Sequence, residues 1–356
     1  MNTIMNGKIT KIVKETEDAV SVYFEPDMGE QGTFSYLPGQ YITLIQQIDG
    51  EEIRRAYSLC TSPYTDKTPA VSIKKVEGGR MSQWANTKLK VGDTIQFLAP
   101  EGRFTPTIDP ANKKQYILVA GGSGITPIMS ILKSVLTQEK DSVVSLIYAN
   151  RNKNSVIFKS DLEQWQKNYA DRLEWIPVYD SGGLFYSGYK GPLKAETMKK
   201  ILAKVLQKDK EQLVFICGPG GMMEAAKAGL ENSSIAAEAI HIEYFVAPGN
   251  TNNKNEKSAS NTVVAEAEVS MKLHGSFHTF KVSGRKTILA GAQDAGFDPP
   301  YSCESGICST CMAKVTEGSV TMIENNILTN KEVEAGFVLT CQALCTSDKV
   351  KVEFFE

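Results

Sequence analysis

The sequence predicts a multidomain protein of 356 residues, with a β domain first, an α/β domain second and a cysteine-rich domain last. Three observations support this fold class. Short β-rich runs between Gly and Pro turns fill residues 1–109, and strand-like and helical runs alternate through residues 110–247. A polar stretch at 248–262 then precedes residues 263–356, which hold five of the seven cysteines. We therefore expect three domains and one linker.

The composition is that of an ordinary globular protein. Apolar residues make up 42% of the chain and charged residues 22%, and the net charge is −2. A protein that binds nucleic acid through a basic face is normally more basic, so we expect no nucleic-acid partner. No apolar run approaches the roughly 20 residues that span a bilayer. The first residues also lack the apolar core of a secretory signal, so we expect a cytoplasmic protein without membrane insertion.

The first domain is expected to be an antiparallel barrel or sandwich. Regular short strands with turn residues between them favour these folds, and turn signals stand at Leu37–Gly39 and Glu77–Gly79. The strand-like runs are Lys8–Val13, Ala19–Phe24, Gln40–Ile45, Arg55–Leu59, Ala70–Lys75 and Thr94–Leu98.

The second domain is expected to contain a parallel sheet, because strand-like and helical runs alternate. The strand-like runs are Gln115–Ala120, Val143–Tyr148, Leu173–Val178, Gln212–Cys217 and Ile240–Phe245. The helical runs are Ile128–Leu136, Lys159–Gln166, Ala195–Leu206 and Gly221–Leu230. The segment Pro248–Thr262 is rich in Asn, Ser and Lys and cannot bury apolar surface, so it is expected to be a flexible linker.

The spacing of four cysteines predicts a [2Fe–2S] cluster. Cys303, Cys308 and Cys311 form a C-x4-C-x2-C run, and Cys341 follows after 29 intervening residues, which is the plant-type spacing. The cluster needs four thiolates on two irons. Small residues and a glycine within the run would let backbone amides turn toward the sulfur atoms. Zinc or a set of inert buried thiols would be the alternative, but zinc sites usually show two C-x2-4-C pairs, which are absent here.

The residues around these cysteines, Tyr301–Cys311 and Leu339–Ala343, resemble the plant-type ferredoxin family. This resemblance runs from about Val263 to Glu356 and implies a β-grasp fold. Cys345 stands beyond the family's motif, so we expect it to be a small buried hydrophobe and not a cluster ligand.

Two motifs in the first domain point to a flavin. In Arg55-Ala56-Tyr57-Ser58, an Arg suits a phosphate, a Tyr suits a ring and a Ser suits a ring nitrogen. A solvated Arg and a half-buried Tyr on any strand would look the same. Farther along, a Gly pair is followed by Arg80-Met81-Ser82. Ser82 stands at the expected start of a helix, which would present N–H groups to an anion.

In order, these motifs resemble the ferredoxin–NADP reductase superfamily, over about Lys8 to Phe245. The resemblance implies FAD in preference to FMN, because the Gly79–Ser82 loop is similar to the FAD-type version. It implies that Arg55 binds the pyrophosphate, that Tyr57 packs on the flavin and that Ser58 lies near its hydride-accepting nitrogen. The remaining implied FAD contacts are Ala56, Lys74, Gly79, Arg80, Met81 and Ser82.

A strand, a glycine turn and a helix at Gln115–Leu136 suit a pyrophosphate at a helix N-terminus. The turn Gly121–Pro127 is not a G-x-G-x-x-G fingerprint, but it is similar to the pyridine-nucleotide turn of the same superfamily. A second signature of that superfamily begins at Cys217, which would face the nicotinamide; a buried inert thiol is the alternative. The implied nucleotide contacts are Gly122, Gly124, Thr126, Pro127, Gly218, Pro219 and Met222.

Glu243-Tyr244-Phe245 resembles the superfamily's terminal acid and aromatic. The resemblance implies that Glu243 lies near Ser58 and that Phe245 covers the flavin and moves aside for nicotinamide. A plain strand end is the alternative. Ser58, Cys217 and Glu243 are the three residues that we expect to position the hydride transfer.

The choice between NADH and NADPH depends on residues after two strands. A carboxylate matches a ribose 2′-hydroxyl, while Arg or Lys matches a 2′-phosphate. Asp180 follows one strand, and Arg151 and Lys153 follow the one before it. Asp180 would repel a phosphate and the two cations would attract one, and on balance the sequence favours NADH.

The whole order resembles the reductase components of multicomponent oxygenases that carry a C-terminal ferredoxin, as in the phenylacetyl-CoA epoxidase and ketosteroid hydroxylase systems. This implies that NAD(P)H is oxidised through FAD and that single electrons pass through the cluster to a protein partner such as an oxygenase, hydroxylase or desaturase. The alternatives are a general NAD(P)H–ferredoxin or flavodoxin reductase and, in a different class, a redox-sensing interaction protein. The sequence names neither the final acceptor nor the oligomeric state.

Overall fold

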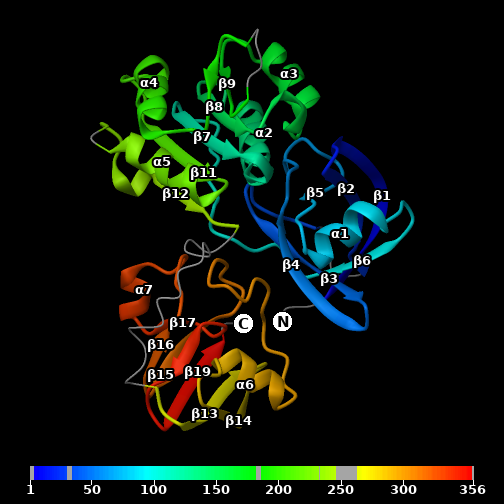
Figure 1. Cartoon of the computed structure of the whole chain (residues 1–356), viewed down its shortest axis with the longest axis vertical. Helices are drawn as coiled ribbons and strands as arrows, with labels where there is room; N and C mark the ends of the chain where they lie inside the picture. The colour runs from blue at the N-terminus through cyan, green and yellow to red at the C-terminus, as the bar shows by residue number, and fades with distance from the viewer. Residues whose placement is uncertain (1–3, 30–33, 182–185, 232, 246–262, 355–356) are drawn as a thin grey trace. The chain divides into compact units, whose positions relative to one another are not determined.

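The computed structural model describes residues 4–29, 34–181, 186–231, 233–245 and 263–354 (Figure 1). These residues form two compact units, which divide after Phe245. The first unit contains the two N-terminal sheets, and the second contains the C-terminal sheet. The expected linker, 248–262, lies outside the described residues.

The N-terminal sheet is antiparallel throughout, and its strand order is β4-β3-β6-β1-β2-β5. A bridge between Leu59 and Val71 joins the two edge strands, β4 and β5, and so closes the sheet into a barrel. Asp49 and Gly50 both have positive φ and form the tight β3–β4 hairpin turn. The strands are β1 (Met5–Thr16), β2 (Ala19–Asp27), β3 (Tyr41–Ile48), β4 (Glu51–Ser58), β5 (Ala70–Lys74) and β6 (Thr94–Phe97). One helix, α1 (Arg80–Thr87), packs on this barrel.

The second sheet is parallel, and its strand order is β10-β9-β8-β7-β11-β12. Its strands are β7 (Gln115–Gly121), β8 (Val143–Asn150), β9 (Leu173–Tyr179), β10 (Tyr189–Lys190), β11 (Gln212–Cys217) and β12 (Ile240–Glu243). Its helices are α2 (Ile125–Gln138), α3 (Lys159–Asn168), α4 (Ala195–Val205) and α5 (Gly220–Leu230), with 3-10 turns η2 (Gly122–Gly124), η3 (Lys153–Ser155) and η4 (Ala237–Ala239). Figure 1 shows α2 and α3 on one face and α4 and α5 on the other, each pair covering its own apolar cluster.

The strand order places a topological switch between β7 and β11. The chain leaves β7 toward β8 and β9 and later returns to β11 on the other side. Ligands of open α/β sheets bind at the carboxyl ends of the strands at such a point. The residues that end β7 and β11 are therefore the ones to examine for a nucleotide site.

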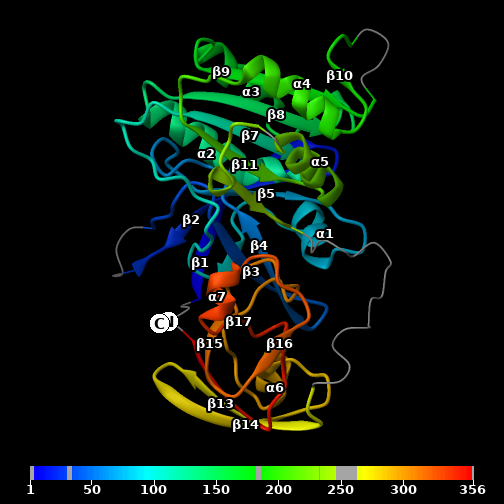
Figure 2. The same cartoon turned by 90° about the vertical axis from the view of Figure 1, so that its left-hand side faces the viewer.

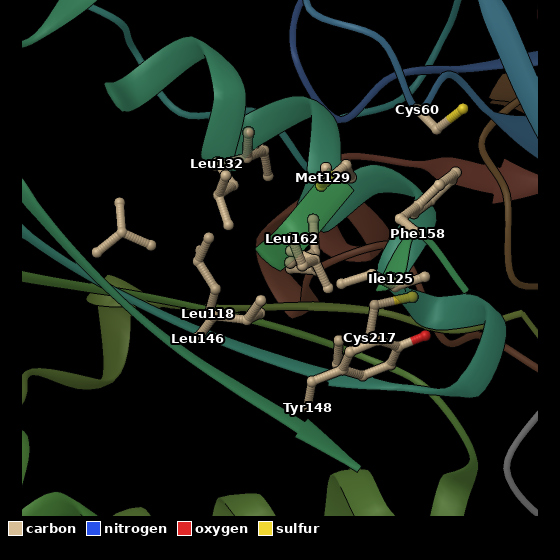
Figure 3. Packing of buried hydrophobic residues seen from close by; sticks show 14 of the residues in the cluster. Cys60, Leu118, Ile125, Met129, Leu132, Leu146, Tyr148, Phe158, Leu162 and Cys217 are labelled. Atoms are coloured by element: carbon tan, nitrogen blue, oxygen red, sulfur yellow. The ribbon is translucent and has the colours of Figure 1, made fainter. Parts of the chain in front are cut away.

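The barrel and the parallel sheet share one apolar cluster. Cys60, Ala70 and Phe104 of the barrel side pack in the same cluster as Met129 of α2 and Cys217 at the end of β11 (Figure 3). Because these side chains pack directly against one another, the position of one sheet constrains the position of the other.

The C-terminal unit is a mixed sheet of order β14-β13-β19-β15-β17 with a separate β16-β18 pair (Figure 2). The pairing of β13 with β19 is parallel and the other pairings are antiparallel. Its strands are β13 (Glu266–Leu273), β14 (Ser276–Ser283), β15 (Met312–Glu317), β16 (Val320–Met322), β17 (Phe337–Leu339), β18 (Ala343–Cys345) and β19 (Lys349–Phe354). Helices α6 (Ile288–Asp294) and α7 (Asn330–Glu334) complete the unit, and α6 buries Ile288 and Ala292 in its core.

Among the described residues, no helix combines the length and the apolarity that crossing a membrane would require.

Candidate functional site

The two glycine turns at the carboxyl edge of the parallel sheet are in direct contact. A Cβ atom on Gly124 would lie 2.1 Å from the Cys217 carbonyl oxygen, and one on Gly121 would lie 2.7 Å from Pro219 Cδ and from Met222 Sδ. A Cβ on Gly218 would lie 2.9 Å from the Gly121 nitrogen. Glycines are required here because the backbones of the turns after β7 and β11 approach closely. The turns that the sequence singled out separately therefore form one surface.

In the described part of the chain, the helices that follow these turns, α2 and α5, begin without a side-chain cap, although the first N–H group of α2, that of Ile125, donates to the Gly122 and Ser123 carbonyls. The Tyr148 hydroxyl donates to the Gly122 carbonyl at 2.9 Å, and the Thr126 hydroxyl donates to the Ser123 carbonyl at 3.1 Å, so the turn is held from both sides. Thr126 and Pro127 are buried in the first turn of α2, so their side chains are not open to a ligand. Such a helix start suits a pyrophosphate.

Cys217 ends β11 as a fully buried thiol. Burial, with a smaller contribution from the charge of Glu243, raises the pKa of Cys217 well above its ordinary value. The thiol is therefore neutral at physiological pH and cannot act as a nucleophile. Because Cys217 packs in the shared apolar cluster, its side chain contributes to packing and not to covalent chemistry.

Ser58 of the barrel meets Glu243 of the parallel sheet. Ser58 ends β4, Glu243 ends β12, and both are buried. Burial raises the pKa of Glu243 to about 8, and a hydrogen bond from Ser58 opposes part of this rise. Its Oε2 atom is buried without a hydrogen-bond partner among the described residues. A buried polar atom without a partner is unusual, and this one belongs to a residue that contacts both sheets through Ser58 and β12.

The strand that precedes Ser58 carries an exposed Arg and a partly buried Tyr. Arg55 is exposed, and one of its N–H groups donates to the Arg54 carbonyl at 2.6 Å. Because the side chain is exposed, its other N–H groups can reach a phosphate. Ala56 and Tyr57 are partly buried, and Tyr57 packs against the barrel core. Arg55 and Ser58 therefore lie at the same end of β4, with Tyr57 between them.

The Gly79–Ser82 loop presents backbone more than side chains. Helix α1 begins at Arg80, and no side chain of the described residues caps it. Met81 is buried in the barrel core, and Arg80 is engaged by the Ile48 carbonyl and Glu51. The Ser82 hydroxyl donates to the Gly79 carbonyl at 3.0 Å and accepts from the Val76 N–H at 3.1 Å. An anion at this loop would therefore meet the N–H groups at the start of α1.

Lys74 lies beside the other turn, the one after β7. Its Nζ atom would be 3.7 Å from a Cβ on Gly122, and it pairs with Asp18 at 3.8 Å. Arg151 pairs with the same carboxylate at 2.8 Å. Burial lowers the pKa of Lys74, and Asp18 opposes this. Asp18 was not predictable from the sequence as a site residue, because a lone carboxylate in a strand turn carries no motif.

Phe245 follows β12 by two residues and is partly buried against the cluster that contains Cys217. Strand β12 ends at Glu243, so the strand-like run Ile240–Phe245 was predicted too long. The aromatic ring therefore belongs to the segment that leaves the sheet.

Four of the five cysteines of the C-terminal unit meet in two pairs. The Cys308 thiol donates a hydrogen bond to Cys303, which lowers the pKa of Cys303 and, together with burial, raises the pKa of Cys308. Cys311 donates to Cys341 in the same way. Within the described residues, no three His, Cys, Asp or Glu side chains converge on the position of a single ion. Two pairs of thiols are the donor set that a cluster of two irons requires.

The loop around these thiols is held by close backbone packing and by hydrogen bonds from one side chain. Gly306 has φ +72°, and a Cβ there would lie 2.8 Å from the Glu324 carbonyl oxygen. The Gln342 amide donates to the Glu304 carbonyl at 3.0 Å and to Cys341 Sγ at 3.5 Å. Hydrogen bonds to sulfur tune the potential of a cluster. Cys345 lies in a different apolar cluster from Cys311 and Cys341, and burial raises its pKa to about 11.

Taken together, the fold and the site define a class: an oxidoreductase with a flavin-binding barrel, a pyridine-nucleotide sheet and a [2Fe–2S] domain. The residues fit these groups, since α1 and α2 begin without a side-chain cap, one oxygen of the buried Glu243 carboxyl lacks a partner among the described residues and four thiols are paired. Family models agree in the same order. Residues 6–105 match an oxidoreductase FAD-binding domain, residues 118–228 an oxidoreductase NAD-binding domain and residues 271–346 a 2Fe-2S iron-sulfur cluster binding domain.

The chain belongs to a family of three-domain reductases, one of whose members is a component of the 1,2-phenylacetyl-CoA epoxidase of Escherichia coli. It is 33% identical to that component over 99% of this chain and 98% of the relative. It is also 35% identical to the ferredoxin reductase component of 3-ketosteroid-9-alpha-monooxygenase from Mycobacterium tuberculosis, over 99% of this chain and 96% of the relative.

Two solved structures share the fold. Phthalate dioxygenase reductase aligns with a TM-score of 0.60 at 21% identity, over 99% of this chain and 98% of that one. An intact type IV self-sufficient cytochrome P450 monooxygenase aligns with a TM-score of 0.70 at 23% identity. That alignment covers 98% of this chain and 41% of the longer one, so the present chain spans less than half of that protein.

The raised pKa of Glu243 makes stability depend on pH. A glutamate in the unfolded chain titrates near pH 4.5, while Glu243 in the folded chain titrates near pH 8. Between these values the folded state holds a proton that the unfolded state has released, so the unfolding free energy falls as pH rises and levels off above about 8. We expect the melting temperature of the wild type to decline across this window relative to that of Glu243→Gln. Flavin release on heating is the measurement that reports the melting temperature. Exposed Glu238→Gln is the control and should follow the wild type, whereas parallel curves for wild type and Glu243→Gln would contradict the assignment.

Proposed function

We propose that this chain is an NADH-dependent reductase that delivers single electrons to a partner protein of the oxygenase class. The observation that carries the proposal is the meeting of Ser58 and Glu243, which joins the end of the barrel strand to the carboxyl edge of the nucleotide sheet. Hydride transfer requires a flavin held by the first and a nicotinamide held by the second to be in contact. The relatives named above support the partner class, because they are components of an epoxidase and a monooxygenase.

When bound, FAD accepts a hydride from nicotinamide and the [2Fe–2S] cluster carries electrons one at a time. Arg55 and the N–H groups at the start of α1 would hold the FAD pyrophosphate, and Tyr57 would cover the ring. When Glu243 is protonated and no longer needs the Ser58 proton, the Ser58 hydroxyl would donate it to the ring nitrogen beside the transferred hydride. Glu243, protonated below pH 8, adds no negative charge at that point. Phe245 would shield the ring until the nucleotide arrives.

The nucleotide would bind along the edge formed by the two glycine turns. The start of α2 and the Lys74 ammonium would bind its pyrophosphate, since both lie at the Gly122 turn. Lys74 is thus assigned to the nucleotide in place of the FAD diphosphate that the sequence suggested. The neutral Cys217 thiol would form an apolar face for the nicotinamide ring.

The preference for NADH rests on Asp180 and Arg151. Asp180 follows β9 directly and is exposed at the carboxyl edge of the sheet, where it suits a ribose 2′-hydroxyl. Arg151, which would otherwise attract a 2′-phosphate, already pairs with Asp18 at 2.8 Å. The remaining cation, Lys153, is exposed in η3.

The proposal also assigns a role to each segment of the chain and a compartment to the protein. Residues 1–109 would form the FAD domain, 110–247 the nucleotide domain, 248–262 the linker and 263–356 the ferredoxin domain. All seven cysteines are free of disulfides, which suits a reducing compartment such as the cytoplasm.

The test is an anaerobic titration of the purified protein with NADH and, separately, with NADPH, recorded in the visible spectrum. We expect NADH at near-stoichiometric amounts to bleach the flavin and cluster bands together. Asp180→Ser should raise the use of NADPH over NADH by about 10-fold, because it removes the repulsion of the 2′-phosphate. Asp209→Ser, an exposed acid before β11 at the opposite edge of the sheet, should leave the preference unchanged.

No bleaching by either nucleotide would overturn the reductase. Bleaching of the flavin alone would show that the ferredoxin domain lies off the path, as a redox-sensing protein would require. Equal bleaching by both nucleotides, unchanged by Asp180→Ser, would leave the reductase standing and remove the role of Asp180.

A further inference from the structure

The loop that follows β4 is fastened to helix α2 by buried hydroxyl groups. The Ser130 hydroxyl donates to the Thr61 carbonyl at 2.6 Å. The Ser62 and Ser134 hydroxyl oxygens are 2.8 Å apart. Ser62, Ser130 and Ser134 each have an exposed fraction of 0%. No element of the proposed function uses these residues.

The donor and the acceptor of each hydrogen bond in this contact are determined. The Ser134 hydroxyl donates to the Ser130 carbonyl at 2.7 Å, and the Tyr64 N–H donates to the Ser62 hydroxyl at 3.2 Å. The proton between the two serines must therefore come from Ser62. Because each hydroxyl has one proton and that proton has one acceptor, no serine can turn away without leaving a buried polar group unpaired.

The barrel end of the contact is fixed as well. The Thr61 hydroxyl oxygen is 2.8 Å from the Tyr36 hydroxyl and accepts from the Ala70 N–H at 3.2 Å. At the rim, Lys133 pairs with Asp66 at 3.2 Å, and Asp66 accepts from the Ser62 N–H at 2.7 Å. These bonds hold the loop to the barrel, and the serine bonds hold α2 to the loop.

The contact lies close in sequence to both halves of the proposed site. Thr61 stands three residues after Ser58, at the end of the strand assigned to FAD. On α2, positions 126, 130 and 134 lie on one face because they are four residues apart, and Thr126 belongs to the nucleotide turn. One hydrogen bond, from Ser130 to Thr61, therefore connects the flavin strand to the nucleotide turn.

We infer that Ser130 and Ser134 are positioning residues that set the distance between nicotinamide and flavin. This inference rests on the proposed function. Neither serine touches a reacting atom; each holds α2 at its place on the barrel. A displacement of about 1 Å, caused far from the chemistry, is enough to slow a reaction by about 100-fold.

The test compares Ser130→Ala and Ser134→Ala with the wild type in the FAD-loaded protein. Ser145→Ala is the matched control, because Ser145 is a buried, hydrogen-bonded serine of the same domain whose partner is Gln115, far from this contact. We expect Ser130→Ala to slow flavin reduction by saturating NADH by at least about 10-fold, with the NADH dissociation constant within about 2-fold of wild type. The long-wavelength absorbance of nicotinamide stacked on flavin should fall in parallel. Ser145→Ala should change neither.

A double-mutant cycle separates positioning from general destabilisation. Ser62→Ala breaks the same link from the barrel side, and it also serves if Ser134→Ala fails to fold. If the link acts as a unit, Ser62→Ala, Ser134→Ala and the double variant slow the reduction by the same factor. Additive losses, or wild-type absorbance and rates in Ser130→Ala and Ser62→Ala, would overturn the inference. A wild type that NADH does not reduce would overturn the proposed function instead.

Discussion

Replacing Cys308 with alanine is expected to lower the NADH-driven reduction of cytochrome c by at least about 100-fold, while ferricyanide reduction stays within about 2-fold of wild type. Cys308 is buried and donates to Cys303, so its loss leaves one pair of thiols incomplete. A cluster of this type needs all four thiolates. Ferricyanide takes electrons from the flavin directly, so it bypasses the missing cluster.

The measurement pairs both activities with the iron and sulfide content per chain and with the visible spectrum. Cys345→Ala is the matched control, because Cys345 is equally buried in the same unit but packs in a different apolar cluster. It should retain the cluster and both activities. A Cys308→Ala protein that keeps cytochrome c reduction would show that the cluster lies off the electron path.

The four proposed cluster ligands could be chosen from the sequence, because the chemistry of such a cluster depends on residue type and spacing. Cys303, Cys308 and Cys311 lie in one short loop, so the chain itself places them together. Cys341 comes from a distant segment, but the structure brings it to Cys311 as the spacing suggested. The separate position of Cys345 also agrees with the expectation that it is a buried hydrophobe.

The sequence predicted which segments are helices better than it predicted where each helix begins. Helix α2 begins at Ile125, three residues earlier than the predicted Ile128. The prediction began the helix after Pro127, yet proline is tolerated in the first turn, where its missing N–H would have no partner. Helix α1 begins at Arg80 and not at Ser82, since Gly79 is extended and ends the preceding loop.

The directions of individual side chains were not predictable, because they depend on contacts between distant segments. The sequence grouped Lys74 with the FAD loop, whereas the structure places its ammonium at the Gly122 turn. Met81 turns into the barrel core, although its motif suggested a ligand contact. The bond from Ser130 to Thr61 joins residues 69 positions apart, and serines in a helix carry no periodic signal that would reveal it.

The second prediction with a large expected effect concerns Gly124, which lies between the two glycine turns. Gly124→Ala is expected to slow flavin reduction by NADH by at least about 100-fold while dithionite still reduces the flavin. Its backbone conformation, with φ −62°, suits alanine, so the effect comes from space alone. A Cβ there would lie 2.1 Å from the Cys217 carbonyl oxygen and 2.7 Å from the Gly218 nitrogen. Both are backbone atoms, so the two nucleotide turns must move apart.

The control for this variant is a glycine of equal crowding on the far face of the sheet. A Cβ on Gly229 in α5 would lie 2.4 Å from Met198 Cβ, so Gly229→Ala also overpacks the nucleotide domain. Each substitution should lower the unfolding free energy by about 1–3 kcal/mol, as overpacked cores do. Only Gly124→Ala should lose NADH reduction, because only Gly124 lies between the turns. If both variants lose it equally, the loss reflects domain stability; if neither does, the contact between the turns has no part in binding the nucleotide.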